Sequence, residues 1–304
     1  MTAYYTISDF AKLAKSYELP ESIAKILKVL SDSVTSTDTT VPATKTAAKP
    51  SKSKEDWSAV RSYKTTKMPE VKVGTEKTIK DIRVALNKFS NKNAETQHDI
   101  IVGLIQQVIG ESKEVEEDTK KVCTLIFDTV SANIFYSSLY AKLYKDLIGI
   151  FPMFSEKMVD IIGNYKDSFN TIKVVDPNTD YDGYCENVKS NDLRRAMTTF
   201  MVNLMKNQAM KESDVLDIIV YLEGLVLTYA EEADKSAIIE EITENIFIAI
   251  TEGAKSLNKT EVWKSQIIPN IHTISKLRKT DAAKYKSMSS RATFKFMDMI
   301  DAMK

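Results

Sequence analysis

The residues that most often perform enzymatic chemistry are few in this chain and stand apart from one another. Neither of the two histidines, His98 and His272, has a nucleophile or a paired carboxylate nearby that would suggest a catalytic dyad. The two cysteines, Cys123 and Cys185, belong to no CxxC motif, and so few ligands cannot build a typical structural zinc site. We therefore expect no bound metal, and two reduced thiols of the kind found in cytosolic proteins.

Motifs that bind nucleotides or expose a catalytic serine are also missing from the sequence. There is no GxxxxGK[ST], GxGxxG or GxSxG stretch, and the acidic runs EVEED and EEITEN lack the Glu-x-x-His spacing of a di-iron bundle. Only 8 glycines occur in 304 residues, which leaves little material for phosphate-binding loops or tight β-turns. We expect no cofactor and no enzymatic activity, so function should reside in binding surfaces.

Charge is unevenly distributed along a chain whose formal net charge is zero. Residues 49–92 contain 12 Lys or Arg against 5 Asp or Glu (net +7), and residues 210–260 contain 4 Lys against 11 Asp or Glu (net −7). Two interpretations stay open: solvated helix faces, or a field that orients two different partners. In the basic stretch Trp57 and Tyr63 could stack on bases, so we expect weak, non-specific, salt-sensitive RNA binding. The residues expected to contact RNA phosphates are Lys52, Lys54, Arg61, Lys64 and Lys67.

The elements that position these surfaces are predicted to be helices. From about residue 76 onward, apolar residues recur at the helical period, and breaks in the pattern delimit about ten helices of roughly 15–20 residues. Ser213-Asp214 and Thr280-Asp281 are predicted to start helices. Alternate breaks are spaced by roughly 40 residues, the period of HEAT-type repeats. We therefore predict an all-α solenoid of about five antiparallel helix pairs over 76–304, with 174–183 as a loop inside the third pair.

Two segments of different composition precede this helical domain. Residues 1–30 carry apolar side chains at helical spacing and are predicted to form a short amphipathic docking segment. Residues 31–56 have scarcely a large apolar side chain to offset the entropy of ordering, so a flexible linker is predicted there. The N-terminus does not have the pattern of a secretory signal, and no apolar run is long enough to span a membrane. We expect a cytoplasmic protein without membrane association.

Three strings in the helical domain carry a resemblance to a known family. IRVALNKFSNKN (82–93) has Leu-Asn-Lys at 86–88, and LIFDTVSANIFYSSLYAKLYKDL (125–147) has an Asn-x-Phe step followed by a Tyr-Ala pair. SSRATFKFMDMID (289–301) has Ser-Ser-Arg, then Phe, then an apolar-acidic alternation. In this order they resemble the HEAT-repeat middle domain of translation initiation factor 4 gamma over about residues 76–304. Phe89 and Ser90 depart from the family's usual Leu and Thr.

The resemblance implies a scaffold that binds a DEAD-box RNA helicase and favours a near-closed arrangement of the helicase lobes. DWSAVRSYKTTKM (56–68) is similar to the Trp-containing extended strand that precedes the family's first helix, so residues 57–75 are expected to be extended. The positions implied to bind the helicase are Trp57, Asn87, Lys88, Phe294 and Asp298. Alternatives stay open for both aromatic residues. Trp57 could pack on its own domain, and Phe294 could be a core residue beside Met297 and Ile300.

A second partner is implied by YTISDFAKL (5–13), which resembles the Tyr-x-x-x-x-Leu-Φ element that binds the mRNA cap-binding protein. Phe10 replaces the Leu of that element, Ala11 replaces its last large apolar residue, and Leu13 could supply the missing contact. Tyr5, Phe10 and Leu13 lie close to one helical face, which fits either docking on a partner or folding back on the solenoid. Two other functions remain possible: a related HEAT scaffold in mRNA decay, splicing or nuclear cap binding, and a transport or structural solenoid.

Overall fold

The structure, a computed structural model, describes residue 21, residues 23–25, residue 28 and residues 74–303. The few described residues between 21 and 28 are helical, and the rest of the architecture belongs to the unit from Glu70 onward. Several predicted site residues lie outside the described residues: Tyr5, Phe10, Leu13, Lys52, Lys54, Trp57, Arg61, Lys64 and Lys67.

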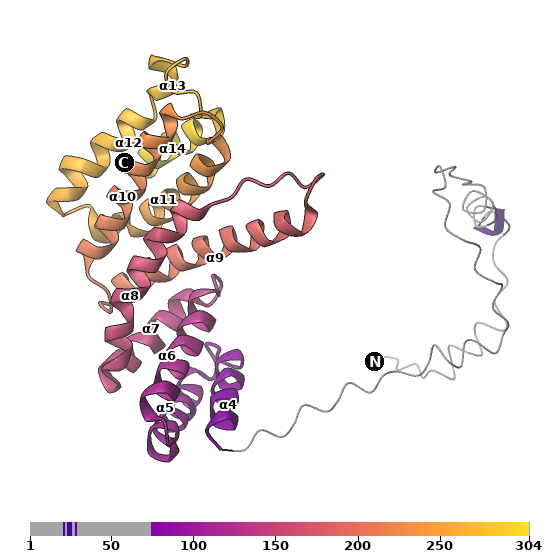
Figure 1. The fold of residues 1–304 in the computed structure, drawn as a ribbon, viewed down its shortest axis with the longest axis vertical. Helices are drawn as coiled ribbons and strands as arrows, with labels where there is room; N and C mark the ends of the chain where they lie inside the picture. The colour runs from indigo at the N-terminus through magenta and orange to yellow at the C-terminus, as the bar shows by residue number, and fades with distance from the viewer. Residues whose placement is uncertain (1–20, 22, 26–27, 29–73, 304) are drawn as a thin grey trace, which may run out of the picture. The chain divides into compact units, whose positions relative to one another are not determined.

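Residues 74–303 fold into helices that pack antiparallel, and no strand occurs among them, as the sequence predicts. Figure 1 numbers the helices from α4. They are α4 (Thr75–Asn87), α5 (Ala94–Glu111), α6 (Val115–Ser131), α7 (Ser137–Ile150), α8 (Met153–Ser168), α9 (Tyr181–Lys206), α10 (Glu212–Glu231), α11 (Ser236–Leu257), α12 (Ile268–Ile274), α13 (Leu277–Thr280) and α14 (Ser290–Ala302). A 3₁₀ turn at Phe169–Thr171 follows α8, and a π-helical turn at Trp263–Ile267 leads directly into α12.

Alternate helices of this unit pack against one another. α7, α9, α11 and α14 contact in that order. α4, α6 and α8 do the same in a second row, and α10 contacts α12 separately. Sequence order therefore follows spatial order, and in Figure 1 the colour changes from purple at α4 to yellow at α12 and α14 along the unit.

An aromatic cluster marks the centre of the core, where α6, α7, α8 and α9 meet. Tyr144 of α7 packs edge-on against Phe127, Phe154 and Phe200, with ring centroids 5.5–5.9 Å away. Edge-to-face rings are the favoured geometry for buried aromatic side chains. Burial also raises the pKa of the Tyr144 hydroxyl well above its usual range, so the group stays neutral.

One predicted helix start is wrong for a local reason. Thr280-Asp281 does not start a helix: Thr280 ends α13, and the Asp281 carboxylate accepts hydrogen bonds from the backbone N–H groups of Ala283 and Lys284 at 3.0 and 2.9 Å. Asp favours turns as well as helix caps, and here it makes a turn. The start of α14 is capped instead by Ser289, whose Oγ accepts from the Ala292 N–H at 3.1 Å.

The predicted loop at 174–183 does lie between α8 and α9, but it ends earlier than expected. α9 begins at Tyr181, because the Asp180 carboxylate accepts the Gly183 N–H at 2.9 Å and caps the helix. α9 is consequently 26 residues long, beyond the predicted length. The helix start predicted at Ser213-Asp214 is nearly correct, since α10 begins at Glu212, one residue before Ser213.

Candidate partner-binding surfaces

The first candidate surface lies at the end of α4, where Asn87 and Lys88 are both exposed. The turn beneath them is held by Phe89, which is buried and stacks on Tyr140 with ring centroids 5.7 Å apart. The Tyr140 hydroxyl donates to the backbone carbonyl of Leu86 at 2.9 Å. These contacts tie the end of α4 to α7, so the two polar side chains are presented from a fixed position.

The second candidate surface lies on α14, where Phe294 is 62% exposed and Met297 is 48% exposed. Asp298 is exposed on the same helix. The buried stripe of α14 contains Phe296, which has no exposed area. The interpretation of Phe294 as a core residue is therefore wrong, because a shift of two positions moves a side chain by about 200° around a helix.

The structure does not bring these two surfaces into one site. α4 and α14 occupy opposite ends of the helical unit, as Figure 1 shows. A single partner that touches both surfaces must span the row of helices between them. The geometry therefore suits a partner with two separated contact regions.

The acidic stretch 210–260 mainly ties helices together. On α11, Glu244 forms ion pairs with both Arg291 and Lys295 of α14, at 3.5 and 3.0 Å. Seven of its eleven acidic residues are buried or form an ion pair with a described residue, Glu232 locally with Lys235 and most of the others across helices: Glu223, Glu231, Glu232, Glu240, Glu241, Glu244 and Glu252. Five basic residues outside the stretch therefore balance much of its net charge of −7: Arg195, Lys206, Lys284, Arg291 and Lys295.

A basic surface that the sequence analysis did not single out lies between α12 and α14. The stretch 276–286 contains five Lys or Arg against one Asp. Four of these side chains are exposed without an ion pair to any described residue: Lys276, Arg278, Lys279 and Lys286. Lys284 instead pairs with Glu231 at 3.1 Å. A count of charges over this window, as made for 49–92, would have found it.

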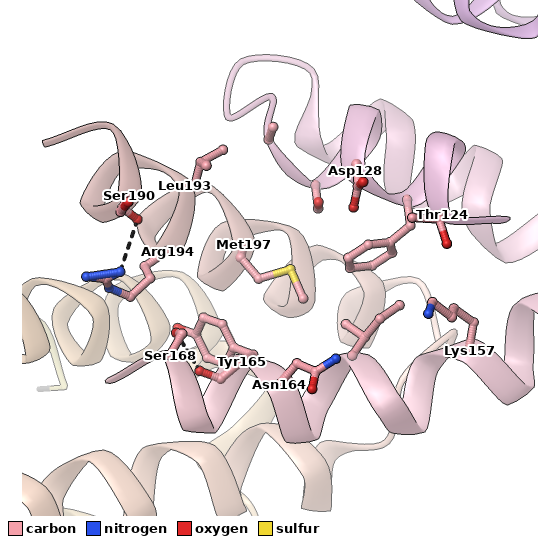
Figure 2. Close-up of a pocket in the computed structure, with 14 residues that line it drawn as sticks. Thr124, Asp128, Lys157, Asn164, Tyr165, Ser168, Ser190, Leu193, Arg194 and Met197 are labelled. Carbon is pink, nitrogen blue, oxygen red and sulfur yellow. Dashed lines mark hydrogen bonds between the residues drawn. The ribbon is translucent and has the colours of Figure 1, made fainter. Parts of the chain in front are cut away.

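A cavity of about 730 Å³ opens between α6, α8 and α9 (Figure 2). Met197 of α9 projects into it, while Asp128 and Lys157 lie at its edge on α6 and α8. Burial raises the pKa of the Asp128 carboxyl, and the charges of Lys157 and Arg83 oppose that shift. The remaining lining is Thr124, Phe127, Ser131, Ala132, Ile161, Asn164, Tyr165, Ser168, Ser190, Leu193 and Arg194. An apolar floor with a polar edge suits an inserted apolar side chain.

A buried polar network fixes the middle of α9 between α8 and α11. The hydroxyl of Tyr165 hydrogen-bonds that of Thr198, which donates to Asn245 Oδ1 at 2.7 Å. Next to them, Arg195 of α9 pairs with the buried carboxylate of Glu241 on α11. Burial raises the pKa of Glu241, and the neighbouring guanidinium opposes that shift. These bonds position α9 only from about residue 194 onward.

His98 is closer to carboxylates than the sequence analysis allowed. Its Nδ1 lies 3.1 Å from Asp99 Oδ1, and its Nε2 lies 4.0 Å from Asp146 Oδ2 on α7. The expectation that no carboxylate lies near this histidine is therefore wrong: Asp99 is its neighbour in the chain, and Asp146 approaches it from α7. The adjoining cavity of about 440 Å³ is lined by no Ser, Thr or Cys side chain that could act as a nucleophile.

Other chemistry-bearing groups in the described part of the chain are isolated. Within residues 74–303, no group of three or more His, Cys, Asp and Glu side chains has a metal-binding arrangement. Both cysteines are free: Cys185 is exposed, whereas Cys123 is buried and its pKa is raised to about 11 by that burial. None of the helices described has the length and apolar character needed to cross a membrane.

Comparison with family models and with curated proteins adds no relative. No family model matches the chain. A search of curated proteins also finds no match. The likeness to the initiation-factor middle domain therefore rests on the three strings in the sequence, which fall on α4, on α6–α7 and on α14.

Proposed function

We propose that this chain is a HEAT-type scaffold for translation initiation that binds a DEAD-box RNA helicase through residues 76–304. The observation that carries the proposal is the order of the three family-like strings along the helical unit. They occupy its first helix, its second helix pair and its last helix. Helix pairs alone are common to many all-α proteins, whereas these strings, in this order, resemble one family.

The packing of alternate helices supports the solenoid part of the proposal. In a solenoid each repeat contacts its neighbours, so each helix packs on the equivalent helix of the next repeat. α7, α9, α11 and α14 follow this rule, and α4 and α6 do so on the other row. Four of the expected pairs pack together, α4–α5, α6–α7, α10–α11 and α12–α14, whereas α8 packs mainly on α7 and α6.

The mechanism we propose is a shift of population rather than chemistry by the scaffold. A helicase of this class has two lobes, and the two candidate surfaces lie at opposite ends of the helical unit. Asn87 and Lys88 would contact one lobe, Phe294 and Asp298 the other, and Trp57 would add an anchor ahead of α4. A scaffold that binds the near-closed arrangement better raises its population and so accelerates the ATPase cycle. Two contacts on one body also add avidity.

This mechanism predicts that the full-length chain raises the RNA-dependent ATPase rate of its cognate helicase several-fold. Phe294→Ala should weaken helicase binding at least tenfold, because an exposed aromatic side chain that becomes buried in an interface contributes about 2 kcal/mol. ATPase assays and calorimetry measure the two effects. Trp57→Ala should act in the same direction.

The matched control is Val159→Ala on α8, where the wild-type side chain is 74% exposed but lies on neither candidate surface. It should leave both binding and stimulation unchanged. The mechanism is wrong if the wild-type chain does not change the ATPase rate, or if Phe294→Ala and Trp57→Ala bind as tightly as wild type.

The proposal includes a cap-binding protein held by the N-terminal segment, and weak RNA binding by Lys52, Lys54, Arg61, Lys64 and Lys67. The wild-type chain should be retained on a cap column through the cognate cap-binding protein, and a Tyr5→Ala, Phe10→Ala variant should be lost from it. Thr2→Ala serves as the control. Equal retention of the double variant contradicts the docking segment. Absence of retention, with helicase binding intact, favours a scaffold in mRNA decay, splicing or nuclear cap binding instead.

A further inference from the structure

Exposed apolar side chains gather on two short stretches of the helical unit. Of the sixteen large apolar residues exposed within 74–303, seven lie in 134–136 and 181–193. They are Ile134, Phe135, Tyr136, Tyr181, Tyr184, Val188 and Leu193. Single exposed apolar residues are ordinary on a protein surface, whereas a contiguous group marks an interaction site.

The two stretches meet at a groove of about 710 Å³. The turn between α6 and α7 lines it with Ala132 and Ile134, and the first half of α9 lines it with Tyr184, Cys185, Val188, Lys189, Asp192, Leu193, Arg195 and Ala196. Phe135, next to Ile134, is 93% exposed. Leu193 and Ala132 also line the cavity of Figure 2. The groove and this cavity therefore adjoin, and together they form a longer apolar surface.

The first half of α9 is a helix with little packed against it. Figure 1 shows this end of α9 extending beyond the neighbouring helices. Tyr181, Tyr184 and Val188 follow at i, i+3 and i+7 and therefore form a stripe along one side of the helix. An apolar stripe beside a groove is the surface on which a second amphipathic helix packs.

The charge beside the groove, on the loop before α9 and on its first turns, is negative, while the groove itself is lined by Lys189, Asp192 and Arg195. Residues 176–192 contain five Asp or Glu against one Lys, a net charge of −4. Asp182 and Glu186 are exposed and form no ion pair with any described residue, while Asp192 pairs with Arg195 at 3.3 Å. Such a rim repels nucleic-acid phosphates and attracts Lys and Arg side chains.

We propose that this groove binds a basic amphipathic helix of a partner protein. Its apolar face would seat against Ile134, Val188 and Leu193, and its Lys or Arg side chains would pair with Asp182 and Glu186. The site lies on α6–α7 and α9, away from the α4 and α14 surfaces, and it does not depend on the proposed function. Helicase stimulation and groove binding can therefore fail separately.

Cys185 is a built-in reporter of groove occupancy, because it lines the groove and is exposed. Cys123 is buried with a pKa of about 11, so iodoacetamide should modify Cys185 far faster. The probe is a synthetic helix of about 18 residues, five turns, with Leu on one face and Lys on the other. At saturation the full-length chain should show at least a fivefold lower alkylation rate at Cys185, measured by mass spectrometry, and the labelled peptide should show raised anisotropy.

Substitutions test both parts of the surface. Val188→Asp and Phe135→Ser should each weaken peptide binding at least tenfold, and Glu186→Lys should weaken it and reduce its salt dependence. Val159→Asp, on the face of α8 turned away from the cavity, and Glu116→Lys on α6 are the matched controls and should bind as wild type. All five replace exposed side chains, so folding should be retained, and circular dichroism checks this.

Four results would overturn the proposal. The first is that the peptide binds while Cys185 stays fully reactive towards iodoacetamide, and the second is that the peptide does not bind at millimolar concentration. The third is that a Leu/Glu peptide of the same pattern protects Cys185 equally well. The fourth is that Cys185 becomes protected from alkylation when the concentration of the chain alone is raised, which would make a second copy of the chain the occupant of the groove.

Discussion

Phe296→Ala is expected to lower the free energy of unfolding by about 3–5 kcal/mol, the usual cost of truncating a fully buried phenylalanine. Phe296 has no exposed area and lies on the face of α14 that packs against α11 and α12. Its removal leaves a cavity at the end of the helical unit, where few neighbouring elements can move in to fill it. Urea unfolding followed by circular dichroism measures the loss.

Phe294→Ala is the matched control, with the same substitution two residues earlier on the same helix. Because Phe294 is largely exposed, its truncation should change the free energy of unfolding by no more than about 0.5 kcal/mol. If the two variants lose similar amounts of unfolding free energy, the face of α14 that packs on the core is not the one described. If Phe296→Ala is too unstable to measure, Phe296→Leu should show a smaller loss in the same direction.

Glu223 should make the free energy of unfolding fall as pH rises from about 4.5 to 8. The Glu223 side chain is fully buried on α10, where burial raises its pKa to about 8 although Asn270 donates a hydrogen bond to Oε2 at 2.9 Å. Below pH 4.5 the carboxyl is protonated in both the folded and unfolded states, so it has no effect. Between the two pKa values only the unfolded chain releases the proton, which costs up to about 1.4 kcal/mol per pH unit. Above pH 8 the effect levels off.

Glu223→Gln removes this titration and keeps an oxygen that can accept the Asn270 amide. The variant should match wild type near pH 4.5 and become more stable than wild type by several kcal/mol at pH 8.5, within an upper limit of roughly 5 kcal/mol. Urea unfolding across this pH range gives the difference between the two proteins. Glu212→Gln, an exposed site at the start of α10, is the control and should show no pH-dependent difference. A constant difference between Glu223→Gln and wild type at every pH contradicts the raised pKa.

The positions of the helices along the chain were predictable, because helix formation depends on residues that are close together in the sequence. Apolar spacing of 3.6 residues is set by local geometry, so most breaks in the sequence pattern coincide with turns in the structure. Boundaries failed where one residue type serves two local structures. Asp281 makes a turn and Asp180 caps a helix, although both are Asp residues beside polar neighbours. Which of the two forms depends on what the following residues pack against.

The candidate surfaces were predictable only in part. Asn87, Lys88 and Asp298 were selected by resemblance, and the structure presents them at the surface. The sequence did not decide whether Phe294 is buried or exposed. Aromatic residues stand at both 294 and 296, and the helical pattern allows either of them to face the core. Contact with α11 and α12 selected Phe296 for burial.

The sequence by itself determined that the part of the chain from α4 to α14 forms successive helices, because amphipathic periodicity depends on residues close together in the sequence. Only the tertiary structure decided how charges and apolar groups combine across the helices. It paired Glu231 of α10 with Lys284 and Glu244 of α11 with Arg291, and it brought Ile134 next to Val188 and Leu193. Those groups are distant in the chain, and their proximity depends on how the helices stack, which no local pattern encodes.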